Sequence, residues 1–255
     1  MKLSTKLICS FLVFNCLVYS SQAQENNSQK FIVHEDLVYP SKIANYEAAA
    51  KLLAETMKEH NAGMAYMTIA FDDDRYMYLS PIDNLAELDS NPFEAVIEAM
   101  GEEAFDKMMS SYDNTFETHK DYVISLENDL SYNSKDIVLE GVNYRHITYN
   151  FVMPDKWDEA KAIAKEWTEL HASKSAPHGY RIYTGGLGTE PSIMVVRWAR
   201  SEAELQDQME ANRQALGDIS DLYNRTMAII RKRETYGAWM KPDLSYQPES
   251  EVAGN

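Results

Sequence analysis

Two histidines and an aspartate lie at spacings that would place them on one face of a β-sheet. Side chains alternate between the two faces of a strand. His34 and Asp36 therefore share a face of the predicted strand Phe31–Val38, and His146 lies on the matching face of the predicted strand Tyr144–Val152. We expect these polar faces to point into one shared interior.

The alternating residues of the same strands are mostly apolar and are expected to face covering helices. They are Phe31, Val33 and Leu37 in the first strand and Ile147, Tyr149 and Phe151 in the second. The opposite faces then form a polar and aromatic lining, as a small-molecule site requires. The candidate ligand-binding residues are His34, Asp36, Tyr66, Tyr76, Tyr78, Tyr144, His146, Asn150 and Arg197.

This set could bind a ligand or transfer a proton, because a neutral imidazole near pH 7 can donate, accept or act as a base. Three interpretations stay open. Side chains fill the interior of many small barrels; otherwise the interior is a ligand cavity, or a catalytic cavity with His34 or His146 as base. The sequence assigns no catalytic residue.

Other motifs do not support a metal, phosphate or hydrolase site. Gly185–Thr189 lacks the Lys-Ser/Thr ending of a phosphate loop, and Asp72–Asp74 lacks the spacing of a calcium loop. His171 has no second histidine within a helical turn. No Ser-His-Asp set or pair of glutamates indicates a hydrolase. We therefore expect no metal and no cofactor.

The elements that would hold these residues occur twice, 114 residues apart. The sequence Asp-Leu-Ser-Tyr stands at 129–132 and again at 243–246, and Pro40 and Lys42 recur as Pro154 and Lys156. Apolar residues at helical spacing match at the same offset, which indicates an internal duplication. The matched residues are Ile43, Tyr46, Ala50, Leu53 and Met57 with Trp157, Ala160, Ala164, Trp167 and His171.

Each copy reads β-α-β-β-α-β, the ferredoxin-like unit. Ser41 and Asp155 are the expected N-caps of the first helices, and Gly101 and Gly217 break the second helical regions. The expected first helices are Ser41–His60 and Asp155–Lys174, the hairpin strands are Gly63–Phe71, Arg75–Ser80, Gly179–Thr184 and Ser192–Ala199, and the last strands are Asp121–Leu126 and Thr235–Met240.

Such a unit covers only one face of its sheet with helices, so the other face must be buried elsewhere. We expect an α+β fold in which two tandem units pack sheet to sheet as one internal α/β barrel. The expected parts are a signal peptide (1–23), a first repeat (31–132), a linker (133–142), a second repeat (143–246) and a flexible tail (247–255). With both units on one chain, we expect a monomer or a weak homo-oligomer.

The first unit resembles the dimeric α/β-barrel superfamily, which includes the NIPSNAP proteins and the antibiotic-biosynthesis-monooxygenase-like domains. The resemblance rests on the segment Glu35–Lys42 followed by Tyr46 and Glu47; the second unit keeps only Pro154 and Lys156. It implies a barrel fold more than an activity. Tandem barrels of the chlorite-dismutase type are similar in layout, but residues 201–230 contain no histidine to ligate haem.

The N-terminus is typical of a secretory signal peptide. Lys2 and Lys6 precede an apolar run at residues 7–18, and Ser21-Gln22-Ala23 fits a cleavage site. We expect a secreted or periplasmic protein without a membrane anchor. Both cysteines, Cys9 and Cys16, lie in this segment, so the mature chain would have neither a disulfide nor a thiol nucleophile.

The chain is strongly acidic, with a formal net charge of −16 that becomes −18 once the two signal-peptide lysines are removed. This charge argues against nucleic acid and anionic membranes as partners. The main expectation is a non-catalytic protein that binds a small, partly apolar or aromatic ligand between the two sheets. The alternatives are a cofactor-independent monooxygenase or isomerase of the dimeric α/β-barrel type, and a structural or interaction module with a filled core.

Overall fold

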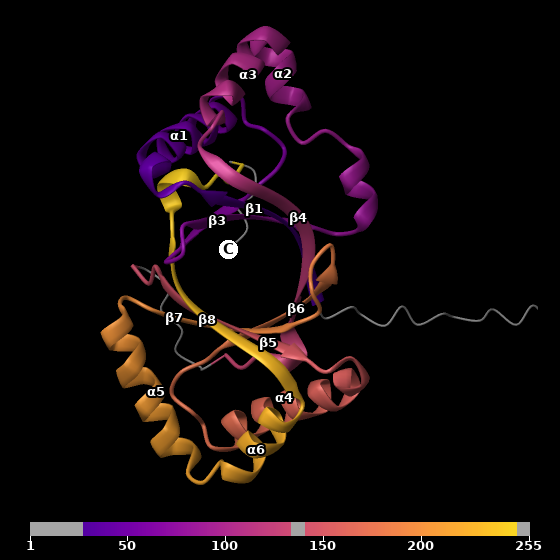
Figure 1. Ribbon diagram of the computed structural model, residues 1–255, viewed down its shortest axis with the longest axis vertical. Helices are drawn as coiled ribbons and strands as arrows, with labels where there is room; N and C mark the ends of the chain where they lie inside the picture. Colours follow the sequence, from indigo (N-terminus) through magenta and orange to yellow (C-terminus); the bar gives the residue numbers. More distant parts are fainter. Residues whose placement is uncertain (1–27, 134–140, 249–255) are drawn as a thin grey trace, which may run out of the picture.

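The computed structural model describes residues 28–133 (the first half) and 141–248 (the second half). The strands are β1 (Ser28–Val38), β2 (Met67–Phe71), β3 (Arg75–Ile82), β4 (Phe116–Glu127), β5 (Tyr144–Val152), β6 (Arg181–Leu187), β7 (Ile193–Ala199) and β8 (Ile230–Met240). They form one closed antiparallel barrel in the order β1-β3-β2-β8-β5-β7-β6-β4 (Figure 1). The expectation of an α+β barrel within a single chain is confirmed, whereas the predicted signal peptide lies outside the described residues.

Helices cover the barrel on two opposite sides (Figure 1). The first half contributes α1 (Ile43–Glu59), α2 (Glu94–Met100) and α3 (Glu102–Met109), and the second half contributes α4 (Trp157–Ser173), α5 (Glu202–Leu216) and α6 (Ser220–Ala228). The predicted helix breaks are confirmed at Gly101 and Gly217, whose φ angles of 86° and 75° favour a residue without a Cβ. Among the described residues, no helix is long and apolar enough to cross a membrane.

The first helix of each half starts differently from the prediction. Ser41 and Asp155 do not cap α1 and α4; they lie within short 3-10 turns, Pro40–Lys42 and Pro154–Lys156. Each turn opens on its proline, whose fixed φ and missing N–H suit a first helical position. The helices therefore begin at Ile43 and Trp157 without a side-chain cap.

The last strand of each half is longer than predicted. β4 begins at Phe116 and β8 at Ile230, ahead of the predicted starts at Asp121 and Thr235. Residues 117–121 of β4 are all exposed, so their polar sequence carries no alternation from which a strand could be predicted. Pairing with β1 holds this segment in the sheet, and the register continues to Phe116.

The two halves meet at matching seams. β2 pairs with β8 at one seam, and β4 pairs with β6 at the other. The repeated Asp-Leu-Ser-Tyr sequences cross these seams, since Tyr132 bridges to Tyr180 and Tyr246 bridges to Tyr66. The end of each half is therefore held by the opposite half, which helps to close the barrel within one chain.

The barrel interior is a packed core shared by both halves. Its buried members are Phe31, Val33, Ile69, Phe71, Met77, Leu79, Tyr122, Ile124, Ile147, Met194 and Ala238. A cavity of about 120 Å³ lies beside Glu35 and Arg75. Side chains therefore occupy most of the space between the two sheets.

The predicted orientation of the strands is wrong. Phe31, Val33 and Ile147 lie in the interior, so their alternates His34 and His146 face the helices instead. A closed barrel of eight strands is narrow enough for side chains to fill. Packing the apolar rows of both halves against each other there removes the most apolar surface from water. The candidate residues of the two halves therefore lie on opposite sides of the barrel rather than in one shared interior.

Candidate functional site

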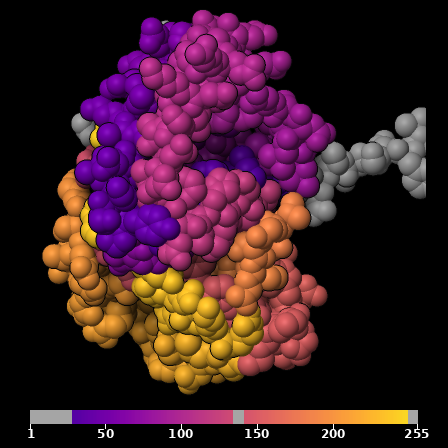
Figure 2. Space-filling model, turned by 45° about the horizontal axis from the view of Figure 1, so that its top comes forward, coloured from indigo at the N-terminus to yellow at the C-terminus, as the bar shows by residue number. Residues whose placement is uncertain are grey.

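A cavity of about 1210 Å³ lies between the strands and the helices of the first half. All of its lining residues fall within Gln29–Asp121. The space-filling view shows the first half hollowed, with indigo atoms of the N-terminal region at the floor of the recess (Figure 2). A small molecule would therefore bind beneath the helices of one half, outside the barrel.

The segment between β3 and α2 forms one wall of this cavity and holds its own shape. The Asn84 side chain accepts from the Ala86 backbone N–H at 2.9 Å, and Glu87 accepts from the backbone N–H groups of Asp83 and Asn84. This reciprocal cap is exposed and local. Because the wall is stabilised from within, it does not need to collapse onto the sheet, and the space below it stays open.

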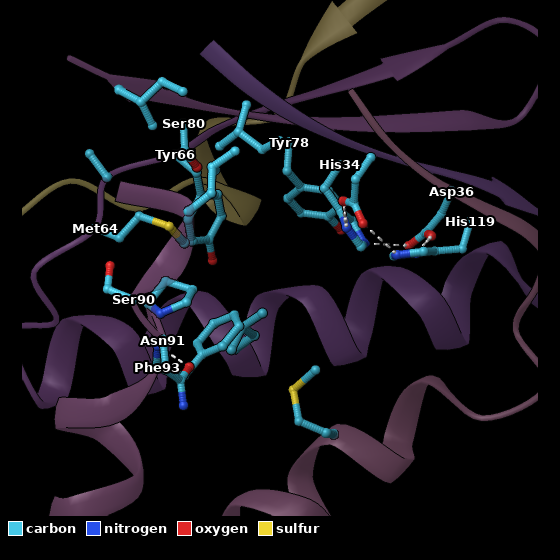
Figure 3. A pocket seen from close by; sticks show the side chains of 18 of the residues that line it. His34, Asp36, Met64, Tyr66, Tyr78, Ser80, Ser90, Asn91, Phe93 and His119 are labelled. Atoms are coloured by element: carbon cyan, nitrogen blue, oxygen red, sulfur yellow. Dashed lines mark hydrogen bonds and ion pairs between the residues drawn. The ribbon is translucent and has the colours of Figure 1, made fainter. Parts of the chain in front are cut away.

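Two histidines and two aspartates form a square on the cavity wall. Figure 3 labels three of them, His34, Asp36 and His119. His34 and Asp36 lie on β1, and His119 and Asp121 lie on β4. The antiparallel register pairs His34 with Asp121 and Asp36 with His119. Residues two apart on a strand share a face, so all four side chains project to the same side.

Each histidine bridges the two aspartates. His34 Nδ1 lies 3.0 Å from Asp121 Oδ1 and its Nε2 lies 3.5 Å from Asp36 Oδ2, while His119 Nδ1 lies 3.0 Å from Asp36 Oδ1 and its Nε2 lies 3.3 Å from Asp121 Oδ2. The Tyr46 hydroxyl on α1 donates to Asp36 at 2.7 Å. The Asp36 side chain is only 3% exposed, whereas that of Asp121 is 57% exposed. The Asp36 carboxylate is thus held inside the protein, and the Asp121 carboxylate is accessible to solvent.

The square changes the acidity of its members. Burial by itself would lower the pKa of His34, but hydrogen bonds and charges from Asp36 and Asp121 outweigh it and raise that pKa above 6.5. Burial by itself would raise the pKa of Asp36, but bonds from His34, Tyr46 and His119 lower it below 3.8. Asp36 therefore remains a carboxylate at neutral pH, and the His34 imidazole is a stronger base than a free one.

Two tyrosines supply polar groups to the same cavity. Both hydroxyls are buried: that of Tyr66 has no hydrogen-bond partner among the residues that the structure describes, whereas that of Tyr78 interacts with Tyr46 and Tyr112. The rings of Tyr66 and Tyr78 meet edge to face at 5.8 Å, and the Tyr78 ring lies at the same distance from His34. Burial raises the pKa of both tyrosines, so both hydroxyls stay protonated. Because an unsatisfied buried hydroxyl costs about 1–3 kcal/mol, a ligand that accepts from Tyr66 would gain that energy.

Four of the nine predicted site residues line this cavity: His34, Asp36, Tyr66 and Tyr78. Tyr76 does not, since its hydroxyl donates to Glu47 at 2.8 Å and its ring packs beside Tyr46. The remaining four lie on the helix-facing side of the second half. Tyr144 packs on Ala199 and Leu205, Asn150 donates to the Ile193 carbonyl, Arg197 lies over the Tyr180 ring, and the His146 Nδ1 atom is buried.

Sequence reasoning missed His119 and Asp121. A signal for them exists, because the pattern His-X-Asp occurs twice, at 34–36 and at 119–121. On two strands this pattern places a histidine and a carboxylate on one face of each. It was overlooked because the predicted last strand began only at Asp121, which left His119 outside the sheet.

The buried His171 on α4 provides a test of pH-dependent stability in the second half. It is 6% exposed, its Nδ1 lies 2.8 Å from the Trp167 carbonyl, and burial lowers its pKa below 6.5. Below pH 6.5 the unfolded chain therefore binds more protons at this position, so its contribution to stability is complete above that pH and is lost as the pH falls. We expect His171→Gln to lose less unfolding free energy than the wild type between about pH 7.5 and 5.5, measured by urea denaturation. Parallel curves for the two proteins would contradict the assignment.

No protein-family model and no curated protein matches this chain. Among solved structures, an anthrone oxidase-like protein matches with a TM-score of 0.52 at 14% identity, over 84% of this chain and 91% of that one. A protein from Fusobacterium nucleatum, named as a candidate monooxygenase, matches with a TM-score of 0.51 at 13% identity, over 83% and 92%. A chlorite dismutase variant from Candidatus Nitrospira defluvii reaches 0.48 at 10% identity, over 86% and 94%, which is too low to carry an argument. The likeness to the first two shows that this chain shares their fold, the closed barrel described above.

Proposed function

We propose that this protein is an enzyme that removes a proton from an electron-rich aromatic or enolisable small molecule and lets the resulting anion react with dioxygen. The observation that carries the proposal is the His34 imidazole, set in a cavity wall between Asp36 and Asp121. A general base works best when its pKa lies near the working pH and a neighbouring group fixes its orientation, as the two carboxylates can do for His34. The alternative of a cofactor-independent oxygenase therefore replaces non-catalytic binding as the favoured reading.

The cavity fits a flat, partly apolar substrate. Its lining combines aromatic and apolar side chains with a few polar groups, as in most small-molecule sites. Figure 3 shows Tyr66, Tyr78, Met64 and Phe93 around the same space that His34 borders. The partnerless hydroxyl of Tyr66, beside the Tyr78 ring, suits a carbonyl or phenolate oxygen of the ligand.

The reaction needs no separate reductant. His34 takes a proton from an activated CH2 group, and the carbanion left behind passes electrons to dioxygen. One oxygen atom forms a carbonyl with that carbon as the second C–H bond breaks, and the other atom leaves as water, so that CH2 and O2 become C=O and H2O. The names of the two similar structures, an anthrone oxidase-like protein and a candidate monooxygenase, denote this class of reaction.

Anthrone is a suitable probe, since its activated CH2 group becomes the carbonyl of anthraquinone. We expect the protein to accelerate both oxygen uptake and quinone absorbance, in a one-to-one ratio. If the protein binds anthrone without turnover, it is a binding protein and not an enzyme for this substrate. Exchange of its acidic hydrogen with deuterium, without oxygen uptake, would favour an isomerase, in which the base returns the proton to another carbon.

The two tyrosine hydroxyls of the cavity wall allow a test of the binding site. Tyr66→Phe and Tyr78→Phe each remove one donor and keep the ring, so each should raise the KM for anthrone about fivefold, equivalent to roughly 1 kcal/mol. Steady-state oxygen uptake measures this effect. Tyr223→Phe on the exposed surface of α6 is the matched control and should leave KM unchanged. An unchanged KM in both cavity variants would place the substrate elsewhere.

A further inference from the structure

The His–Asp square has a second property that proton transfer does not require. His34 Nδ1 and His119 Nε2 both point at the carboxylate of Asp121, at 3.0 and 3.3 Å. One ligand atom from each of these three residues lies within 4.8 Å of the others. Two ligands of a metal with bonds near 2.1 Å are at most about 4.2 Å apart. The distances of 3.0 and 3.3 Å from the two ring nitrogens to Asp121 fall below this limit, so one ion could contact all three residues.

We propose that His34, His119 and Asp121 bind a divalent transition-metal ion, with Asp36 as the outer carboxylate that orients both histidines. Metal-bound histidines commonly donate their second ring N–H to a carboxylate, which fixes the tautomer. Asp36 occupies that place for both rings, 3.0 Å from His119 Nδ1 and 3.5 Å from His34 Nε2. An ordinary cross-strand ion pair would not need this second carboxylate.

The outer carboxylate is itself held in place. Asp36 is buried, and the Tyr46 hydroxyl, from a fully buried residue of α1, donates to it at 2.7 Å. Both histidines and Asp121 stand on paired strands, whose register fixes the spacing of their Cα atoms. The ligand set is therefore built into the sheet and the first helix rather than into a loop.

The ligand types select the class of ion. Two imidazole nitrogens and one carboxylate oxygen suit zinc, iron(II), cobalt(II) or nickel(II), whereas magnesium and calcium prefer ligand sets made of oxygen alone. Three protein ligands leave further coordination positions free. Since the square borders the large cavity, those positions would face a bound small molecule.

Metal binding would also regulate the enzyme, and this part of the inference rests on the proposed function. A bound ion takes the ring nitrogen of His34 that points at Asp121, which competes with proton removal by the same imidazole. We expect a bound ion to inhibit anthrone oxidation by the metal-free protein. Regulation of this kind would make turnover depend on the metal content of the surroundings.

The test uses the full chain without a histidine tag, first treated with EDTA. Cobalt(II) binding is followed by visible absorption and zinc(II) binding by isothermal titration calorimetry. We expect one ion per chain, at least 100-fold weaker binding in His119→Ala and Asp121→Asn, and 10- to 100-fold weaker binding in Asp36→Asn. His60→Ala, at the end of α1, is the control and should bind as the wild type does. Circular dichroism checks that each variant is folded. If another variant does not fold, the test relies on Asp121→Asn, because that side chain is exposed and its substitution should not affect folding.

Absence of stoichiometric binding, or equal affinity in wild type and Asp121→Asn, would overturn the metal site. The anthrone assay separates this inference from the proposed function. Binding with inhibition supports both. Binding with faster turnover supports the metal site and overturns metal-free proton removal by His34, while turnover without any binding overturns the metal site alone.

Discussion

Substituting His34 with glutamine is expected to reduce the metal-free turnover of anthrone by about 10²- to 10⁴-fold, the usual contribution of a positioned general base. Glutamine keeps a polar group of similar length beside Asp121 but cannot accept the proton. The His34 side chain is 40% exposed, so the substitution should leave the fold intact. Initial rates of oxygen uptake in the presence of EDTA measure the loss without interference from a bound ion.

The pH profile identifies His34 more sharply than the rate alone. Because Asp36 and Asp121 raise its pKa above 6.5, the wild-type rate should increase with pH through a value above 6.5, as the imidazole loses its proton. That step should be absent from His34→Gln. His178→Gln, in the second half, should keep both the rate and the step. A His34→Gln variant that retains the step would show that another group is the base.

Replacing Arg75 with methionine is expected to destabilise the protein by roughly 3 kcal/mol, near the lower end of the range for breaking a buried ion pair. Arg75 is 16% exposed, lies 3.5 Å from the buried Glu35, and stacks between the rings of Phe71 and Tyr236 at 4.5 and 4.3 Å. Its loss leaves Glu35 in the barrel interior with Tyr122 and Lys120. Lys120 still neutralises part of the Glu35 charge, so we expect the loss of unfolding free energy to lie at the lower end of that range.

Urea denaturation measures this change in unfolding free energy. Arg213→Met removes an exposed ion pair with Glu210 and should leave the unfolding free energy close to that of the wild type, which makes it the matched surface control. The double variant Glu35→Gln/Arg75→Met should recover part of the loss, because no buried charge then lacks its partner. A single Arg75→Met variant within 0.5 kcal/mol of the wild type, on the order of ordinary surface substitutions, would contradict the role of this pair.

Much of the fold could be predicted because it depends on local patterns. The 114-residue period predicted the order of the strands and helices, and the glycines at 101 and 217 predicted where the second helical regions break. Helix starts and the long last strands were less predictable. Residues 117–121 are exposed and polar, so only their hydrogen bonds to β1 hold them in the sheet.

The candidate site shows the same division. Alternation along β1 determined that His34 and Asp36 share a face, and the structure confirms that they do. Alternation cannot say which face is inside, since a barrel buries both faces of its strands, one against the other sheet and one against helices. The face that packed more apolar side chains became the barrel interior, and the cavity formed on the other face.

By itself, the sequence determined the residue types and their alternation: a histidine two residues before an aspartate, on each of two strands. Only the tertiary structure decided that these strands are neighbours in an antiparallel register that places His34 beside Asp121 and Asp36 beside His119. The spacing of side chains along one strand is fixed by covalent geometry and can therefore be predicted from the sequence. Pairing between strands 83 and 87 residues apart depends on how the whole barrel closes, because the hydrogen bonds and the packing that select the register form between distant parts of the chain.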